Sequence, residues 1–433
     1  MPILAKRFLE DVARIATTLP AGAHVINVCA DRYRFTVGFA ASLLTRKVSL
    51  LPSTHTPEVI RQLAAFAPDV FCLTDDAHCD IDLPRVHYTD SSTSTGFRGS
   101  PDTPWQSPEI DSGQLAAYVF TSGSTGTPLP YKKTWGRLLR CVRNGAERLG
   151  LRDGRAYALV ATVPPQHMYG FESSVLLGLQ SGGAVCAERP FYPADVCSTL
   201  AVIPRPRVLI STPIHLRALL AAEVSLPATD LIVSATAPLS QELAREVERR
   251  WSTRLLEIYG STETGQIAAR RPAQTLEWRL WPDVSLAPKE GQTWAQGGHI
   301  EQPTAMCDLL ESTGADRFLL HGRLADLVNI AGKRSSLAYL NHQLTSIQGV
   351  VDGTFFIPEE NHASRTAVTR VAAFVVAPGL NAATLVSELR KRIDPAFLPR
   401  PMLFVDRLPR NSTGKLPQEA LRAFAAAHLK SAT

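Results

Sequence analysis

Short apolar segments alternate with helical patterns along most of the chain. Runs of β-branched and other apolar residues predict strands at 24–29, 48–51, 70–73, 117–120, 158–163, 208–211, 231–234 and 255–259. A helix is predicted at 35–44, and a second begins at Thr56-Pro57-Glu58, where a capping residue precedes a proline and an acid. This alternation predicts an α/β fold, with mostly parallel sheets flanked by helices.

The pattern changes after about residue 325. A strand is predicted at 371–376, and a helix begins near Asn381 with an apolar stripe that includes Leu385 and Leu389. The sequence Asp394-Pro395 ends this helix. We therefore predict a large N-terminal domain, residues 1–325, and a small α+β C-terminal domain, residues 326–433.

Composition places the chain among globular proteins, with 45% apolar and 20% charged residues. The net charge of +5 comes without a block of Lys or Arg, so no nucleic-acid partner is predicted; an anionic substrate or an acidic partner protein is compatible with it. No leader segment and no membrane span are recognised, and we expect a cytoplasmic protein. The seven cysteines include no C-x-x-C pair, which favours reduced, buried thiols.

The segment TSGSTGT follows a predicted strand directly and places hydroxyls between glycines. Successive amides and hydroxyls of such a loop can surround phosphate oxygens, so the segment is a candidate phosphate loop, with a flexible linker as the alternative. It lacks the Walker pattern and the first glycine of a nucleophile elbow. The candidate residues are Thr121, Ser122, Gly123, Ser124, Thr125, Gly126 and Thr127.

Four segments together resemble the signatures of the adenylate-forming superfamily, which includes acyl- and aryl-CoA synthetases, peptide-synthetase adenylation domains and luciferases. They are TSGSTGTP, YGSTETG from Tyr259, HGRLADLVNIAGKR from His321, and LPRNSTGKL from Leu408. They occur in the family's order and cover nearly the whole chain. The resemblance implies ATP and Mg²⁺ as cofactors and a C-terminal domain that moves between half-reactions.

The resemblance also implies roles for single residues. Tyr259 would stack on adenine beside Gly260 and Ser261, Thr262 would contact the α-phosphate, and Glu263 would hold Mg²⁺, a cation that prefers carboxylates and phosphate oxygens. Lys415 would contact the carboxylate and the α-phosphate and stabilise the transition state. The remaining implied positions are Ala235, Thr236 and Ala237 beside adenine, Asp308 and Arg323 at the ribose, Asp326 at the hinge, and His167, Met168, Tyr169 and Phe171 at the acyl pocket, with His167 also in the catalytic set.

The chain departs from the family pattern at several positions. Leu129 stands where the phosphate loop normally continues with lysine, and Lys132 or Lys133 could replace it. The loop SATAP, residues 234–238, lacks the glycines that many relatives have, and Asn329 stands where lysine is common. These departures indicate a compact, divergent branch. They make the prediction of thioester formation weaker than the prediction of adenylation.

Substrate and acceptor are open at the level of sequence. Met168 argues against a salicylate-like acid, because aryl-activating relatives have asparagine there for a ring hydroxyl; Glu172 is the only local anion for an α-amino acid. The compact form resembles the AMP-ligases of aryl-polyene (xanthomonadin-type) pigment pathways. We therefore favour a benzoate-type acid such as 4-hydroxybenzoate, loaded onto an acyl carrier protein or CoA, with a fatty acid as the alternative.

Two readings of other classes compete with this one. A serine hydrolase would use Ser124 and need no ATP. A degenerate, non-catalytic binding protein is suggested by Leu129 and Asn329, and is opposed by the joint presence of Glu263 and Lys415 with the ribose residues.

Overall fold

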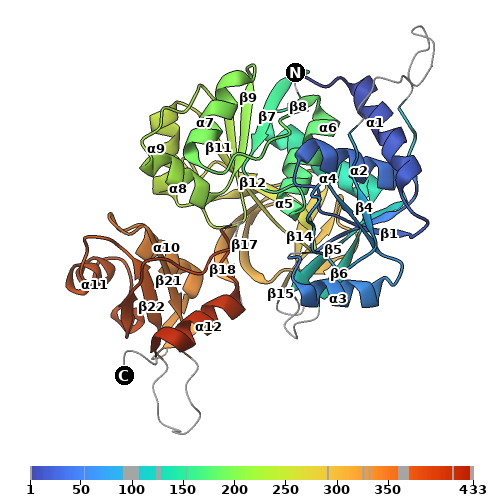
Figure 1. The fold of residues 1–433 in the computed structure, drawn as a ribbon. Helices are drawn as coiled ribbons and strands as arrows, with labels where there is room; N and C mark the ends of the chain where they lie inside the picture. The colour runs from blue at the N-terminus through green and yellow to red at the C-terminus, as the bar shows by residue number, and fades with distance from the viewer. Residues whose placement is uncertain are drawn as a thin grey trace.

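The computed structural model describes residues 2–52, 54–90, 107–122, 128–152, 154–289, 292–323, 327–330, 333–358, 370–411 and 414–429. Within these residues the large domain contains two main sheets with helices around them, and the small domain lies to one side (Figure 1). None of the described helices is both long and apolar enough to cross a bilayer.

The first sheet has the strand order β4-β3-β1-β2-β5-β6. Its strands are β1 (His24–Asn27), β2 (Val48–Leu51), β3 (Phe71–Thr74), β4 (Arg85–His87), β5 (Leu115–Ser122) and β6 (Pro128–Thr134). All neighbours are parallel except β5 and β6, which form an antiparallel pair. The helices of this region are α1 (Ala5–Thr18), α2 (Arg32–Leu44), α3 (Pro57–Phe66) and α4 (Trp135–Leu149).

The second sheet has the order β17-β18-β13-β12-β11-β10-β9-β7-β8. Its strands are β7 (Tyr157–Ala161), β8 (Gly183–Val185), β9 (Arg207–Ser211), β10 (Leu231–Ser234), β11 (Arg254–Ser261), β12 (Gly265–Arg270), β13 (Trp278–Leu280), β17 (Asp308–Gly314) and β18 (Arg317–Arg323). The half from β8 to β11 is parallel, and the half from β11 to β17 is antiparallel. The prediction of mostly parallel sheets therefore holds for the first sheet and for one half of the second.

The connections of the second sheet are largely helical. They are α5 (Met168–Gly170), the π-helix η1 (Phe171–Leu176), α6 (Leu177–Ser181), α7 (Pro193–Val202), α8 (Pro213–Ala221) and α9 (Gln241–Trp251). A small antiparallel sheet contains β14 (Val284–Lys289), β15 (Gln292–Gly297) and β16 (Thr304–Ala305). Its side of the domain is filled by Trp278, Trp281 and Phe318, each 2% exposed or less.

The C-terminal domain has cores of its own. Its elements are β19 (Leu327–Ile330), β20 (Lys333–Ser336), α10 (Leu337–Thr345), β21 (Asp352–Phe356), β22 (Ala372–Val376), α11 (Ala382–Arg390), the 3₁₀ turn η3 (Pro395–Phe397), β23 (Met402–Phe404) and α12 (Gln418–Leu429). Among the described residues, its buried apolar clusters contain positions from 328 onward, whereas those of the large domain end at Phe318. The division at 325/326 stays a prediction, because residues 324–326 lie outside the described part of the chain.

Several local predictions are confirmed. The strands at 48–51 and 231–234 have the predicted bounds, and α3 begins at Pro57 after its N-cap Thr56. Asn381 caps α11 by accepting a hydrogen bond from the amide of Thr384, and Leu385 and Leu389 are fully buried. Burial of the thiols is confirmed for Cys29, Cys72, Cys79 and Cys141 and is wrong for Cys307, which is exposed.

Candidate active site

The predicted phosphate loop connects β5 to β6. Thr121 and Ser122 end β5, and their backbones pair with Leu129 and Pro128 of β6. Gly123, Ser124, Thr125, Gly126 and Thr127 lie outside the described residues, so the phosphate contacts of this loop stay a prediction. The pairing nevertheless places both ends of the loop at the carboxyl end of a parallel strand, the edge at which α/β sheets bind ligands.

The segment YGSTETG forms the tip between β11 and β12, with Thr262 and Glu263 in the turn. The turn is closed from within, because the hydroxyls of Ser261 and Thr264 lie 3.1 Å apart and each accepts a hydrogen bond from the backbone amide of the other residue. Gly265 has a left-handed backbone with φ +74°, and a Cβ on it would lie 2.8 Å from Oε1 of Glu172. The turn is therefore tightly fixed where it joins β12.

The predicted adenine and ribose residues are joined across the second sheet. The hydroxyl of Tyr259 donates a hydrogen bond to Oδ2 of Asp308, the first residue of β17. The Tyr259 ring packs 5.5 Å from Trp278 and 5.7 Å from Phe318, measured between ring centroids. The backbone of Arg323 pairs with Asp308, while the Arg323 side chain and Asp326 lie outside what the structure describes. A rigid aromatic support thus holds Tyr259 beside the carboxylate of Asp308.

The loop SATAP follows β10, next to Tyr259 on the neighbouring strand β11. Ala235 is buried, Thr236 and Ala237 are partly buried, and Thr236 has φ +80°. This left-handed backbone is costly for a β-branched residue, of the order of 1–3 kcal/mol. The glycines common at this loop in the resembling family would adopt the same backbone without that cost.

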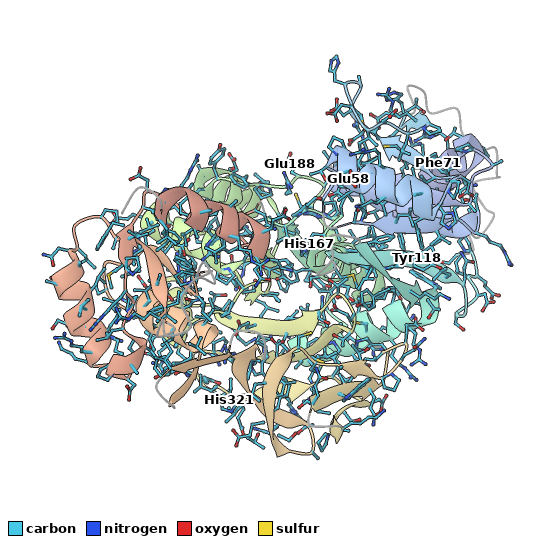
Figure 2. The ribbon with its side chains drawn as sticks, turned by 90° about the horizontal axis from the view of Figure 1, so that it is seen from below. Glu58, Phe71, Tyr118, His167, Glu188 and His321 are labelled. Carbon is cyan, nitrogen blue, oxygen red and sulfur yellow. The ribbon has the colours of Figure 1, made fainter. Side chains whose placement is uncertain are left out.

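His167 lies near the middle of the molecule, with the small domain on one side of it and the first part of the large domain on the other (Figure 2). It precedes α5, and its Nδ1 accepts a hydrogen bond from the amide of Tyr169 at 3.4 Å. The hydroxyl of Tyr169 donates to the carbonyl of Val233 in β10 at 3.0 Å, which ties α5 to the nucleotide-side strand.

The predicted acyl-pocket residues differ in where they lie. Phe171 is fully buried in the core and makes edge contacts with Phe35 and Phe39, while Tyr169 is 6% exposed. Met168 is partly buried against the same core. His167 and Met168 are therefore the more accessible members of the set, and Phe171 is a packing residue.

Lys415 comes from the small domain and lies near His167. Burial lowers the pKa of His167 to about 4, and the positive charge of Lys415 adds to that decrease. The residue before Lys415, Gly414, has φ +79°, and a Cβ on it would lie 2.8 Å from the Ile214 side chain of α8. The loop therefore lies against the large domain at the start of α8, and the side chain of Lys415 is exposed there.

The residue that holds this loop, Arg410, is not among the predicted site residues. Arg410 binds both carboxylate oxygens of Asp352, at 2.7 and 2.8 Å, and its third nitrogen donates to the carbonyl of Gly414 at 3.1 Å. Asn411 closes the turn by accepting a hydrogen bond from the amide of Lys415 at 2.9 Å. A bidentate arginine–carboxylate pair is directionally specific, so the arrangement fixes the base of the Lys415 side chain.

A second missed group is a buried polar set beneath the Glu263 turn. Its members are Lys133, Cys141, Glu172, Ser173, Gln266 and His299, each at most 6% exposed. The Cys141 thiol donates to Oε1 of Glu172 at 3.5 Å, and Gln266 donates to the hydroxyl of Ser173 at 2.8 Å. An α-amino acid is not served by Glu172, because this carboxylate is 2% exposed and engaged inside the protein.

The charged groups of this set shift one another's pKa values, in addition to the effect of burial. Burial lowers the pKa of Lys133, against the opposing effect of Glu172, and burial raises the pKa of Glu172, against the effect of Lys133. Burial, followed by the charge of Lys133, lowers the pKa of His299 to about 3. From the sequence, Lys133 could be placed on the same face of a strand as Tyr131. Its partners could not be predicted, because they come from distant segments.

The amino-acid sequence is similar to those of known enzymes. A family model described as "AMP-binding enzyme" matches residues 12–295. The 4-coumarate–CoA ligase of Rhodobacter capsulatus is 31% identical over 307 residues, which is 70% of this chain and 75% of that protein. The 4-chlorobenzoate–CoA ligase of an Arthrobacter species is 26% identical over 359 residues, 72% of this chain and 66% of that protein.

Solved structures show the same fold. ATP-bound MatB from Rhodopseudomonas palustris superimposes with a TM-score of 0.80 at 18% identity, over 97% of this chain and 93% of that one. The o-succinylbenzoate CoA synthetase MenE from Bacillus subtilis, in complex with its acyl-adenylate intermediate, gives 0.78 at 17% identity, over 96% and 92%.

Fold and site together define an AMP-forming acid ligase, which uses ATP to activate a carboxylic acid as an acyl-adenylate. The chain belongs to the family of AMP-binding enzymes.

Proposed function

We propose that the protein activates a benzoate-type aromatic acid, such as 4-hydroxybenzoate, and transfers the acyl group to a phosphopantetheine thiol. Support for the aromatic acid comes from relatives whose names contain 4-coumarate and 4-chlorobenzoate. The single structural observation that carries the activation step is that the loop of Lys415 lies against Ile214 of α8, which brings this cation of the small domain near His167.

In the first half-reaction, an oxygen of the substrate carboxylate attacks the α-phosphorus of ATP. A bond forms between that oxygen and phosphorus, the bond to the β-phosphate oxygen breaks, and pyrophosphate leaves with its electron pair. Tyr259 holds adenine, Asp308 binds ribose, Thr262 contacts the α-phosphate, and Lys415 offsets the negative charge that develops at phosphorus. His167 stays neutral and borders the acyl group, because a pKa of about 4 keeps it unprotonated near neutral pH.

Magnesium fits the donor set at the turn. The carboxylate of Glu263 is partly exposed, and within the described part of the chain no lysine or arginine forms an ion pair with it. A carboxylate that is available in this way, together with phosphate oxygens, is the environment that Mg²⁺ prefers. Glu263 would hold the ion, which supplies charge neutralisation for the triphosphate.

In the second half-reaction, a thiol attacks the carbonyl carbon of the adenylate. A thioester forms, AMP leaves, and the thiol proton passes to solvent. CoA and a phosphopantetheinylated acyl carrier protein present the same thiol; the relatives named as CoA ligases support CoA, and a role in pigment assembly would require the carrier. Asp326 is the proposed hinge residue between the half-reactions.

The proposal is tested by acid-dependent ATP–pyrophosphate exchange with a panel of 4-hydroxybenzoate, benzoate, salicylate, 4-coumarate, octanoate and an amino acid. We expect exchange with the para-substituted aryl acids and little with salicylate. Octanoate as the preferred acid would replace the aryl proposal with the fatty-acid alternative. No exchange with any acid would overturn the proposal, and ester hydrolysis without ATP would point to the hydrolase.

Once an acid is found, the acceptor is tested with it. Free CoA and a phosphopantetheinylated carrier protein are supplied separately, and the thioester is measured by mass spectrometry. A product with CoA alone supports the CoA ligase, and a product only with the carrier supports carrier loading. An unmodified carrier that lacks the phosphopantetheine arm is the matched control.

A further inference from the structure

Two adjacent lysines follow the phosphate loop, and they point to opposite faces of β6. Lys132 is exposed, whereas Lys133 is 6% exposed. This is the alternation expected of a strand, in which successive side chains leave on opposite sides. Of the two candidates for replacing the lysine missing at Leu129, only Lys133 faces the Glu263 turn.

The Lys133 ammonium group donates a hydrogen bond to the backbone carbonyl of Glu263 at 2.8 Å. The contact joins residues 130 positions apart, and it attaches the turn between β11 and β12 to the strand that leaves the phosphate loop. The next residue, Thr134, donates from its amide and its hydroxyl to Oε1 of Glu301, at 2.7 and 2.6 Å. The carboxyl end of β6 is thus fixed at two successive residues.

Burying an ammonium group is expensive unless hydrogen bonds and opposite charges compensate for the lost hydration. The structure supplies both around Lys133: one hydrogen bond to the backbone carbonyl of Glu263, and the nearby carboxylates of Glu172, Glu301 and Glu263 itself. A leucine or methionine would fill the same space without this requirement. The chain therefore has a costly residue at a position from which, among the described residues, the ammonium group donates its hydrogen bond to the Glu263 backbone.

The same turn is closed from its inner side by Ser261 and Thr264. Lys133 holds the turn from a different element, the buried face of β6, at the backbone carbonyl of Glu263. Holding that carbonyl restricts the peptide plane after Glu263 and so limits the directions in which its carboxylate can point.

We propose that Lys133 is a positioning residue for Glu263: it orients the carboxylate that holds Mg²⁺ with ATP, and it makes no contact with phosphate itself. This inference rests on the magnesium role given to Glu263 in the proposed function. Leu129 stands where the resembling family has a lysine after the phosphate loop. Lys133 would supply a cation to the same nucleotide site, but through the Glu263 turn and not by contact with phosphate.

The experiment compares Lys133→Met with its matched control Lys132→Met in the full-length protein. ATP binding is measured by calorimetry with Mg²⁺ and, separately, with EDTA, in the absence of any acid substrate. For Lys133→Met we expect the affinity for Mg·ATP to fall about tenfold and metal-free ATP binding to change by less than about twofold. Lys132→Met should match the wild type in both. A Lys133→Met protein with wild-type Mg·ATP affinity would overturn the inference, and so would an equal loss with and without Mg²⁺.

A second comparison tests whether Lys133 acts through Glu263. In the Glu263→Gln background, adding Lys133→Met should cause little further loss of Mg·ATP affinity, because the carboxylate to be oriented is gone. A further loss of about tenfold would show that the two residues act independently and would overturn the inference. Lys133→Arg, which keeps the cation and the donors, should recover part of the affinity.

One more variant tests whether the loss of affinity in Lys133→Met comes from disturbed folding. Lys133→Met leaves Glu172 buried without its nearby cation, so Lys133→Met/Glu172→Gln removes both charges while Gln keeps a hydrogen-bonding group beside Cys141. The double variant should show the same magnesium-specific loss. These binding measurements need no acid substrate. Failure of the acid panel would therefore overturn the proposed function, whereas the roles of Lys133 and Glu263 in Mg·ATP binding are decided by the calorimetry alone.

Discussion

Lys133 and Lys415 serve the same predicted nucleotide site in opposite ways. Lys133 lies inside the large domain, is almost fully buried, and donates to a backbone carbonyl. Lys415 is exposed at the end of a loop in the small domain, and its charge reaches His167 only because that loop lies against α8. A cation that positions a neighbour gains from burial and rigidity, whereas one that acts on the reacting atoms must be able to arrive and leave with its domain.

The largest effect is expected from Lys415→Ala. Removing the cation that stabilises the transition state should lower acid-dependent ATP–pyrophosphate exchange by at least about 100-fold. ATP binding measured by calorimetry should change by no more than a few fold, because the lysine contributes mainly during reaction. This is the reverse of the pattern expected for Lys133→Met. Retained exchange in Lys415→Ala would remove the catalytic role.

An intermediate effect is expected from Arg410→Gln. The variant loses the bidentate pair with Asp352 and the bond to the Gly414 carbonyl, so Lys415 should be present but less well placed. We expect exchange to fall about tenfold, with the Mg²⁺ dependence of ATP binding unchanged. Arg407→Gln, at an exposed neighbouring arginine, is the control and should keep wild-type exchange. Equal rates in both variants would show that Arg410 does not position the loop.

The smallest effect is a pH dependence at His167. Its pKa is lowered from 6.5 to about 4 in the folded protein, so the unfolded chain binds a proton at a higher pH than the folded one. The stability from a neutral His167 is therefore complete above pH 6.5 and is lost as the pH falls toward 4. As the pH falls over this interval, the free energy of unfolding should decrease in both proteins. The decrease should be about 1–2 kcal/mol smaller for His167→Phe than for the wild type, after allowance for partial exposure.

Urea unfolding of the two proteins at a series of pH values measures that difference. Because burial is the main cause of the shift and Lys415 the second, Lys415→Ala should reduce the acid sensitivity only in part. Identical pH profiles for wild type and His167→Phe would contradict the placement of a buried neutral imidazole beside Lys415.

Strand positions could largely be predicted from the sequence, because a buried parallel strand leaves a short, dense apolar run. The bounds of β2 and β10 follow directly from such runs. The antiparallel half of the second sheet could not be predicted in this way, since β13 is short and both β12 and β13 carry polar residues such as Gln266 and Arg279. The first helix, α1, also escaped prediction, although Val12 and Ile15 on its buried face carry a helical spacing.

The site was predictable where chemistry is concentrated in a motif and not where it depends on distant partners. Glu263 and Lys415 were found within four short segments. The pairing of Tyr259 with Asp308 spans 49 positions and could not be read from either segment. Likewise, aromatic residues after His167 suggested a pocket, but only packing could separate Phe171, in the core, from the accessible Met168. Patterns along a chain report which residues are apolar, and the fold decides what they face.

The left-handed backbone at Thr236 affects how much conformational entropy its loop would lose on binding a nucleotide. A glycine there would relieve strain but would let the loop sample many more conformations before the nucleotide arrives. Threonine restricts that sampling, so the loop beside Tyr259 has less conformational entropy to lose if a nucleotide binds there, as predicted. Some global stability is thereby given up for a loop whose backbone is restricted before any ligand binds.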